Sequence, residues 1–182
     1  MSLTGRWIDL IFRVATGDWK TRLVVAPIAG ALFLSMVAFF ILLSLITDDL
    51  LNLPNLFQGA WAMVAGGCLV ICGAFLAFIS IAYFIRARGT PVPFCPPPSL
   101  ITAGPYRFSR NPMLTGIFTL LFGIGIVMDS TSLVFFFTPL FILFNVWELK
   151  RVEEPELSRR LGQEYREYRN RTPMFFPFRI RR

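Results

Sequence analysis

The chain contains no histidine and only three cysteines. The absence of histidine excludes His-ligated haem, di-iron and zinc sites, and it excludes any histidine general base. Cys68 and Cys72 are four residues apart in an apolar run, where a helix places them on one face as small packing residues. Cys95 stands alone, so no disulfide framework is expected. The sequence therefore predicts neither a metal centre nor a disulfide scaffold.

Charged residues are also scarce. They make up 16% of the 182 residues, whereas 55% are hydrophobic and the mean hydropathy is +0.61. A soluble domain of this length needs more polar surface. The formal net charge is +7, but the arginines flank apolar runs, which is typical of lipid headgroup contacts and topology control. The composition predicts a single membrane domain, residues 1–182, that contacts the lipid bilayer and binds no nucleic acid.

Four apolar runs predict the fold class. Residues 23–46 and 56–85 contain no charged residue, and each run exceeds the roughly 20 residues that a bilayer crossing needs. Residues 113–128 and 131–147 are shorter, and the polar turn at Asp129 separates them, so they predict a helical hairpin. A pair of re-entrant segments is the alternative. We expect an all-α integral membrane fold with about four transmembrane helices.

The placement of basic residues predicts the orientation. Residues 23–85 and 111–149 contain no lysine or arginine, although the chain has 18 of them. Four crossings bring every basic residue to one side and leave Asp48, Asp49 and Asp129 on the other. By the positive-inside rule, both termini are then cytoplasmic. The expected location is a bacterial or archaeal inner membrane.

Two terminal segments flank the apolar runs. Residues 1–22 predict an N-terminal interfacial helix, with a frayed tail as the alternative. Residues 148–182 predict a cytoplasmic segment that contains an amphipathic helix, and Pro155 permits a fresh helix start there. Its apolar and aromatic stripe consists of Leu157, Leu161, Tyr165 and Tyr168.

The segment 86–112 is a proline-rich cytoplasmic loop that ends in a motif. Its prolines prevent a regular helix, and Pro112 suits the first turn of the next helix. Backbone donors at such a helix start can hold an anionic group. A linker with snorkelling arginines is the alternative.

Glu153 and Glu154 lie just past the fourth apolar run. Adjacent carboxylates at a membrane surface can hold a cationic ligand group, or they can pair with neighbouring arginines. The candidate partners are Arg159, Arg160, Arg166 and Arg169.

The glycines indicate packing. Gly123 and Gly125 form a GxG pattern, but no strand precedes it, so a nucleotide loop is not expected. Close helix approach is predicted at four others, Gly66, Gly67, Gly73 and Gly116.

Two motifs lie in the second half of the chain. The first is the run Gly104-Pro-Tyr-Arg-Phe-Ser-Arg-Asn-Pro-Met, followed by Gly116. The second is the run Glu153-Glu-Pro-Glu-Leu, then Leu161-Gly-Gln-Glu-Tyr-Arg-Glu-Tyr and Thr172-Pro. They resemble the patterns GPYRYxRNPMYxG or RHPMYxG, and EExxL…FGxEYxxYxxxVPR, of isoprenylcysteine carboxyl methyltransferase-like membrane proteins. The similarity covers about residues 86–177. Asn111 stands where many members have His, and Leu114 stands where Tyr is usual.

The resemblance implies a methyltransferase that uses S-adenosylmethionine and needs no metal. Its methyl acceptor would be a lipid-like or small apolar molecule bearing a carboxylate, thiol or amine. The implied catalytic residues are Arg110 and Glu154. The implied cofactor-binding residues are Tyr106, Arg110, Asn111, Pro112, Glu153, Glu154 and Tyr165. An NADPH-dependent membrane reductase related to sterol reductases, and a non-enzymatic membrane module, are the alternatives.

Overall fold

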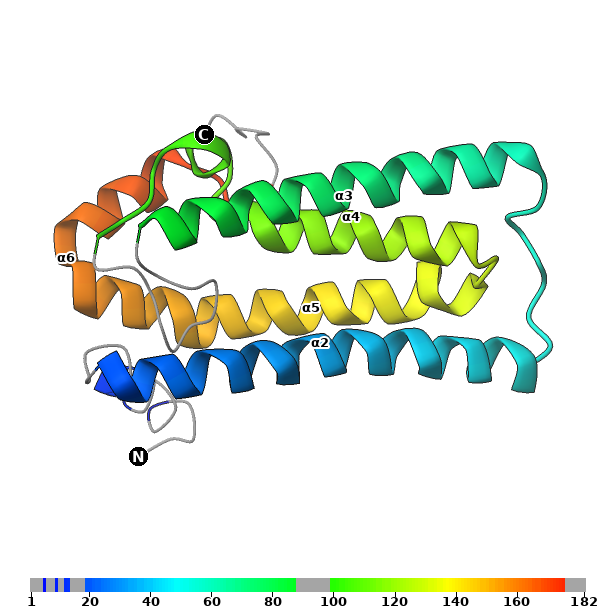
Figure 1. The fold of residues 1–182 in the computed structure, drawn as a ribbon, viewed down its shortest axis with the longest axis horizontal. Coiled ribbons are helices and arrows are strands. Elements are labelled where there is room, and N and C mark those ends of the chain that lie inside the picture. The colour runs from blue at the N-terminus through cyan, green and yellow to red at the C-terminus, as the bar shows by residue number, and fades with distance from the viewer. Residues whose placement is uncertain (1–4, 6–8, 10–11, 14–18, 88–98, 176–182) are drawn as a thin grey trace.

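A computed structural model describes residues 5, 9, 12–13, 19–87 and 99–175 of the chain. Within these residues all regular structure is helical. Figure 1 shows the long helices lying side by side, with the last helix folded across one end. The elements are α2 (Trp19–Leu50), α3 (Ala60–Arg86), the 3₁₀ turn η1 (Gly104–Arg107), α4 (Pro112–Val127), the π turn η2 (Leu133–Phe137), α5 (Thr138–Glu148), the π turn η3 (Leu149–Glu153) and α6 (Glu154–Arg171).

The helices have the length and apolarity of membrane spans. Among the described residues, three helical segments are long and apolar enough to cross a bilayer: Pro27–Leu50, Ala60–Arg86 and Leu133–Arg171. The helix α4 has 16 residues, so it is about 24 Å long and shorter than the ~30 Å hydrocarbon core. It runs antiparallel to α3 and then turns into η2 and α5 as the predicted hairpin (Figure 1). The chain is an all-α integral membrane protein.

Helices α3 and α4 pack backbone to backbone because their glycines face one another. A Cβ atom added at Gly73 would lie 2.5 Å from the amide nitrogen of Leu120. A Cβ atom added at Gly116 would lie 2.6 Å from the carbonyl oxygen of Gly73. Gly66 and Gly123 meet in the same way further along the two helices. Small residues at these positions therefore allow an approach that any side chain would prevent.

Two other glycines refine the sequence prediction. A Cβ atom at Gly67 would have nothing within 4 Å, so the predicted close approach there is wrong. A Cβ atom at Gly125 would lie 2.7 Å from a methyl carbon of Val134. The GxG pattern of Gly123 and Gly125 therefore joins α4 to two neighbouring elements, α3 and η2.

Phenylalanine rings hold α2 against the hairpin. The Phe40 ring centroid lies 5.7 Å from that of Phe141 and 6.0 Å from that of Phe137. Phe33 and Phe118 contact the same Phe141 ring at 5.9 and 6.0 Å. Each such pair adds about 0.5–1.5 kcal/mol beyond the burial of its area.

Acidic side chains tie together the end of the bundle opposite α6. Asp48 of α2 accepts hydrogen bonds from the Ser130 hydroxyl and, at 2.8 Å, from the Ser132 backbone N–H. Asp129 accepts a hydrogen bond from the Phe57 backbone N–H at 2.7 Å. These contacts join α2 and the α2–α3 loop to the turn before η2. We call this end the acidic end, and the end that carries residues 99–111 and 149–175 the motif end.

The last helix departs from the prediction at Pro155. A fresh start there is wrong, because the helix continues from α5 through η3 into α6. Each π turn ends two residues before a proline, Pro139 and Pro155. A proline ring clashes with the carbonyl four residues earlier, and the wider π turn relieves that clash. The predicted amphipathic helix is present, but Gly162 breaks it with a φ of 58°.

The predicted interfacial helix over residues 1–22 lies largely outside the described residues, as do Cys95 and most of the predicted proline-rich run. Two described residues near the N-terminus contact α6. Asp9 forms an ion pair with Arg159 at 2.8 Å, and the Arg159 guanidinium lies 4.4 Å from the Phe12 ring centroid.

Candidate active site

The first motif folds against the end of α3. Gly104 has a φ of 59°, which glycine adopts without strain, and it packs on the Tyr83 ring. The turn η1 then buries Tyr106, and this burial raises the pKa of its hydroxyl well above the usual range. Pro112 begins α4, as predicted, and is fully buried. The motif thus packs against α3 and leads directly into α4.

The end of the second motif runs alongside the first. The Arg110 backbone N–H donates a hydrogen bond to the Pro173 carbonyl oxygen at 2.9 Å, and the Asn111 backbone N–H donates to the Met174 carbonyl oxygen at 3.1 Å. The same Met174 oxygen accepts hydrogen bonds from the Asn111 side-chain amide at 3.2 Å and the Ser109 hydroxyl at 3.0 Å. Two segments far apart in the sequence are therefore held as one unit.

Two tyrosines of α6 reach the first motif. The Tyr168 hydroxyl donates a hydrogen bond to the Tyr106 carbonyl oxygen at 2.6 Å. The Tyr165 hydroxyl accepts a hydrogen bond from Arg110 Nη1 at 3.5 Å. Burial raises the pKa of Tyr165 to about 12, so its hydroxyl is neutral and keeps its own proton available for donation.

Arg110 forms an ion pair with Glu154. The distance from Arg110 Nη1 to Glu154 Oε1 is 2.5 Å, and the two side chains are only 12% and 15% exposed. Arg169 approaches the other oxygen of Glu154 at 3.8 Å. Arg110 Nε is buried and has no hydrogen-bond partner among the described residues. The guanidinium therefore has one donor committed to Glu154 and another free for an anionic group.

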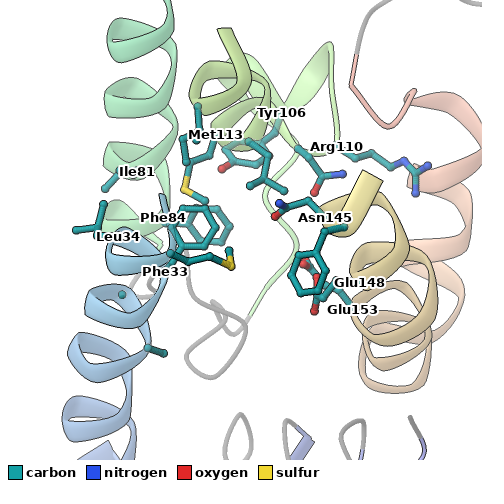
Figure 2. A pocket seen from close by; sticks show the side chains of 17 residues that line it. Phe33, Leu34, Ile81, Phe84, Tyr106, Arg110, Met113, Asn145, Glu148 and Glu153 are labelled. Atoms are coloured by element: carbon teal, nitrogen blue, oxygen red, sulfur yellow. The ribbon is translucent and has the colours of Figure 1, made fainter. Parts of the chain in front are cut away.

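A cavity of about 390 Å³ adjoins this ion pair. Its size is typical of small-molecule sites, which occupy about 300–1,000 Å³. Figure 2 shows apolar side chains such as Leu34, Phe33, Ile81 and Phe84 on one side, with Glu148 and Glu153 facing them across the cavity. The polar lining residues are Tyr106, Arg110, Asn111, Asn145, Glu148 and Glu153. The cavity is thus apolar toward α2 and α3 and acidic toward α5 and η3.

Glu153 differs from its neighbour Glu154. Glu153 lines the cavity and makes no ion pair within 4 Å among the described residues. Burial, and then the nearby carboxylate of Glu148, raise the pKa of Glu153 above its usual range. A cationic group in the cavity would favour its ionised form.

The structure brings most of the predicted site residues together. Tyr106, Arg110, Asn111 and Glu153 line the cavity, and Glu154 and Tyr165 contact Arg110 behind it. Pro112 lies outside the cavity wall.

Two polar wall residues were missed, Asn145 and Glu148. In hindsight, the sequence holds one signal for Glu148. Pro155 indicates a widened helical turn in the residues that precede the proline, directly after Glu148.

The middle of the chain is similar to a known protein family. A family model for phospholipid methyltransferases matches residues 61–164, more than half of the chain. The family match and the membrane-spanning helices identify a membrane methyltransferase. The chain belongs to the phospholipid methyltransferase family, which is related to the isoprenylcysteine carboxyl methyltransferase-like proteins. No curated protein and no solved structure matches the chain.

Proposed function

We propose that this protein transfers a methyl group from S-adenosylmethionine to a lipid-like acceptor at the cytoplasmic membrane face. The observation that carries the proposal is the convergence of both motifs on one cavity. Arg110 and Glu154, 44 residues apart in the chain, meet beside a cavity that is acidic on one side and apolar on the other. Membership of the family favours this function over the reductase alternative.

The residues present fit the cofactor. S-adenosylmethionine has a cationic sulfonium, a cationic amine and a carboxylate, and it supplies an electrophilic methyl group. Glu153, on the cavity wall, would neutralise a cationic group, and Glu154, paired with Arg110 behind that wall, would contribute a second carboxylate. The Nε donor of Arg110 would bind the carboxylate of the cofactor. Tyr106 and Asn111 line the same wall, and Tyr165 supports Arg110 from behind. We assign cofactor binding to these side chains and catalytic positioning to Arg110 and Glu154.

The chain's own contribution is orientation and exclusion of water. Methyl transfer is an in-line displacement, in which correct alignment of donor and acceptor supplies much of the rate. The apolar wall, which includes Phe33, Phe84, Met113 and Phe144, matches an acyl or prenyl chain. This wall supports a lipid-like acceptor. Asn111 and Leu114, which replace the usual His and Tyr, also line the cavity.

Ligand binding to the purified protein tests the proposal. We expect S-adenosylhomocysteine, the demethylated product, to bind with micromolar affinity in calorimetry and to raise the thermal transition. NADPH is the comparison ligand, because the reductase alternative requires it. Stabilisation by NADPH, or by neither ligand at millimolar concentration in a folded preparation, would refute the methyltransferase assignment.

A further inference from the structure

Glu148 places a second carboxylate in the cavity, outside both motifs. It is the last residue of α5, and it lines the cavity together with Asn145, one turn earlier on the same helix. Figure 2 shows Glu148 beside Glu153, across the cavity from Phe33 and Phe84. A carboxylate in such apolar surroundings is costly without a partner, so its position calls for a function.

The π turn η3 is what aligns the two carboxylates. Glu148 and Glu153 are five residues apart, and in a regular α-helix that spacing would separate their directions by about 140°. The turn η3 spans Leu149–Glu153 and accommodates one extra residue. The pair therefore behaves like residues four apart, which share a helix face. Both side chains reach one cavity for this reason.

The charges around the cavity favour a cation. The segments of α2, α3 and α4 that line it contribute uncharged side chains only, and the loop contributes Tyr106, Arg110 and Asn111. Arg110 is the one cation on the described part of the wall, and Glu154 neutralises it. An acceptor carboxylate would meet Glu148 and Glu153 without a compensating charge, whereas an acceptor ammonium would pair with Glu148 and leave Glu153 for a cationic group of the cofactor.

We propose that Glu148 binds the ammonium headgroup of a lipid amine and accepts its proton, with Asn145 orienting that headgroup. The assignment rests on the proposed methyltransferase function and adds the residues that bind the acceptor amine and take up its proton. Asn145 donates one side-chain N–H to the Phe141 carbonyl at 2.8 Å, which fixes its amide in place. Its side-chain oxygen remains able to accept a hydrogen bond from an ammonium group.

The proposed step balances. A lipid ammonium gives one N–H proton to the ionised Glu148 carboxylate, and the nitrogen keeps the electron pair of that bond. The free pair forms a new N–C bond to the methyl carbon of the cofactor, while the electron pair of the broken S–C bond stays on sulfur. The products are a methylated ammonium, S-adenosylhomocysteine and a protonated Glu148. Glu148 then returns its proton to water.

The variant Glu148→Gln tests the proposal, with Glu164→Gln, an exposed carboxylate of α6, as the matched control. Vesicles containing phosphatidylethanolamine supply the lipid amine. We expect Glu148→Gln to bind S-adenosylhomocysteine within twofold of wild type, which also shows that it is folded. Its methylation rate at pH 7 should fall about 100-fold or more, the usual contribution of a positioned base.

The pH profile separates a proton acceptor from a structural residue. In Glu148→Gln the rate should rise about tenfold per pH unit toward the pKa of the amine, because only the amine that is already deprotonated can then react. Wild type and Glu164→Gln should not show this steep rise. A second variant, Asn145→Ala, should raise KM for the amine lipid while leaving cofactor affinity unchanged.

Three outcomes would overturn the assignment. Glu148→Gln could retain a third or more of the wild-type rate at pH 7, or it could lose its rate with no recovery at high pH. Wild type could also methylate a fatty acid or a lipid thiol but not phosphatidylethanolamine. That outcome would support methyl transfer but contradict an amine acceptor. Failure of wild type to bind S-adenosylhomocysteine would instead refute the proposed function itself.

Discussion

Arg110 and Glu154 form a 2.5 Å ion pair in which both side chains are mostly buried. The pair joins the start of α4 to the start of α6, so it couples the two motifs directly. Exposed ion pairs contribute only ~0–1 kcal/mol, whereas breaking a buried pair leaves an uncompensated charge and costs more. The pair is therefore placed both to hold the motif end together and to receive a charged ligand.

Substitution of Arg110 by lysine should lower cofactor affinity at least tenfold. Lysine keeps the charge but has no planar fork, so it cannot contact Glu154 and an anionic ligand group together. Calorimetry with S-adenosylhomocysteine measures the change. Arg107→Lys is the control, because Arg107 is exposed at the end of η1, and it should be nearly silent. Equal effects at both positions would instead indicate that Arg110 is a snorkelling anchor at the membrane surface.

Glutamine substitution at Glu153 and at Glu154 should weaken the cofactor about 10- to 150-fold each. This range corresponds to the loss of a charge-assisted contact of ~1.5–3 kcal/mol. The two variants should differ in stability, because only Glu154 has ion-pair partners on the described part of the chain. In thermal unfolding without ligand, Glu154→Gln should therefore lower the transition temperature more than Glu153→Gln does. Normal ligand affinity in both variants would indicate that Glu153 and Glu154 have a structural role only.

The α3–α4 contact should be intolerant of even one added methyl group. We expect Gly73→Ala to destabilise the protein by about 1–3 kcal/mol, because its Cβ atom would meet the Leu120 backbone nitrogen, which cannot move aside. Gly67→Ala is the matched control on the same helix, since its Cβ atom would have nothing within 4 Å. Thermal unfolding in detergent measures both. Similar transition temperatures for the two variants would contradict the packing.

The sequence predicts the helices well because apolar runs and small residues carry a local signal. Residues 23–46 and 131–147 fall within helical segments, and the close contact at Gly73 follows from its size. Only one of the two ion-pair partners of Glu154 could be found this way, namely Arg169, which approaches it at 3.8 Å. The candidates were arginines nearby in the chain, whereas the ion-pair partner at 2.5 Å, Arg110, lies 44 residues earlier.

The role of Glu148 was missed for a different reason. A periodicity of 3.6 residues directs Glu148 and Glu153 to different faces, and only the extra residue of η3 brings them together. The family resemblance did not help either, since its acidic motif begins at Glu153. The sequence prediction therefore failed where the helix departs from regular α-helical geometry. The same departure brings the second carboxylate, Glu148, into the cavity.

Membrane topology gives the last prediction, that the motif end is cytoplasmic and the acidic end is on the opposite side. The three native cysteines are first replaced by alanine. Single cysteines then go to Asp49 and Asn55 at the acidic end and to Ala103 at the motif end, all of which are exposed. Asp129 is unsuitable for labelling because its carboxylate holds the Phe57 N–H at 2.7 Å.

A membrane-impermeant maleimide applied to intact cells should label Asp49→Cys and Asn55→Cys. It should label Ala103→Cys only after permeabilisation. The physical reason is that all 18 basic residues then lie on the cytoplasmic side, as the positive-inside rule requires. Labelling of Asp49→Cys and Asn55→Cys only after permeabilisation would invert the orientation. Labelling of all three positions from the same side would instead contradict the four-crossing arrangement, because the acidic and motif ends would no longer be separated by the bilayer.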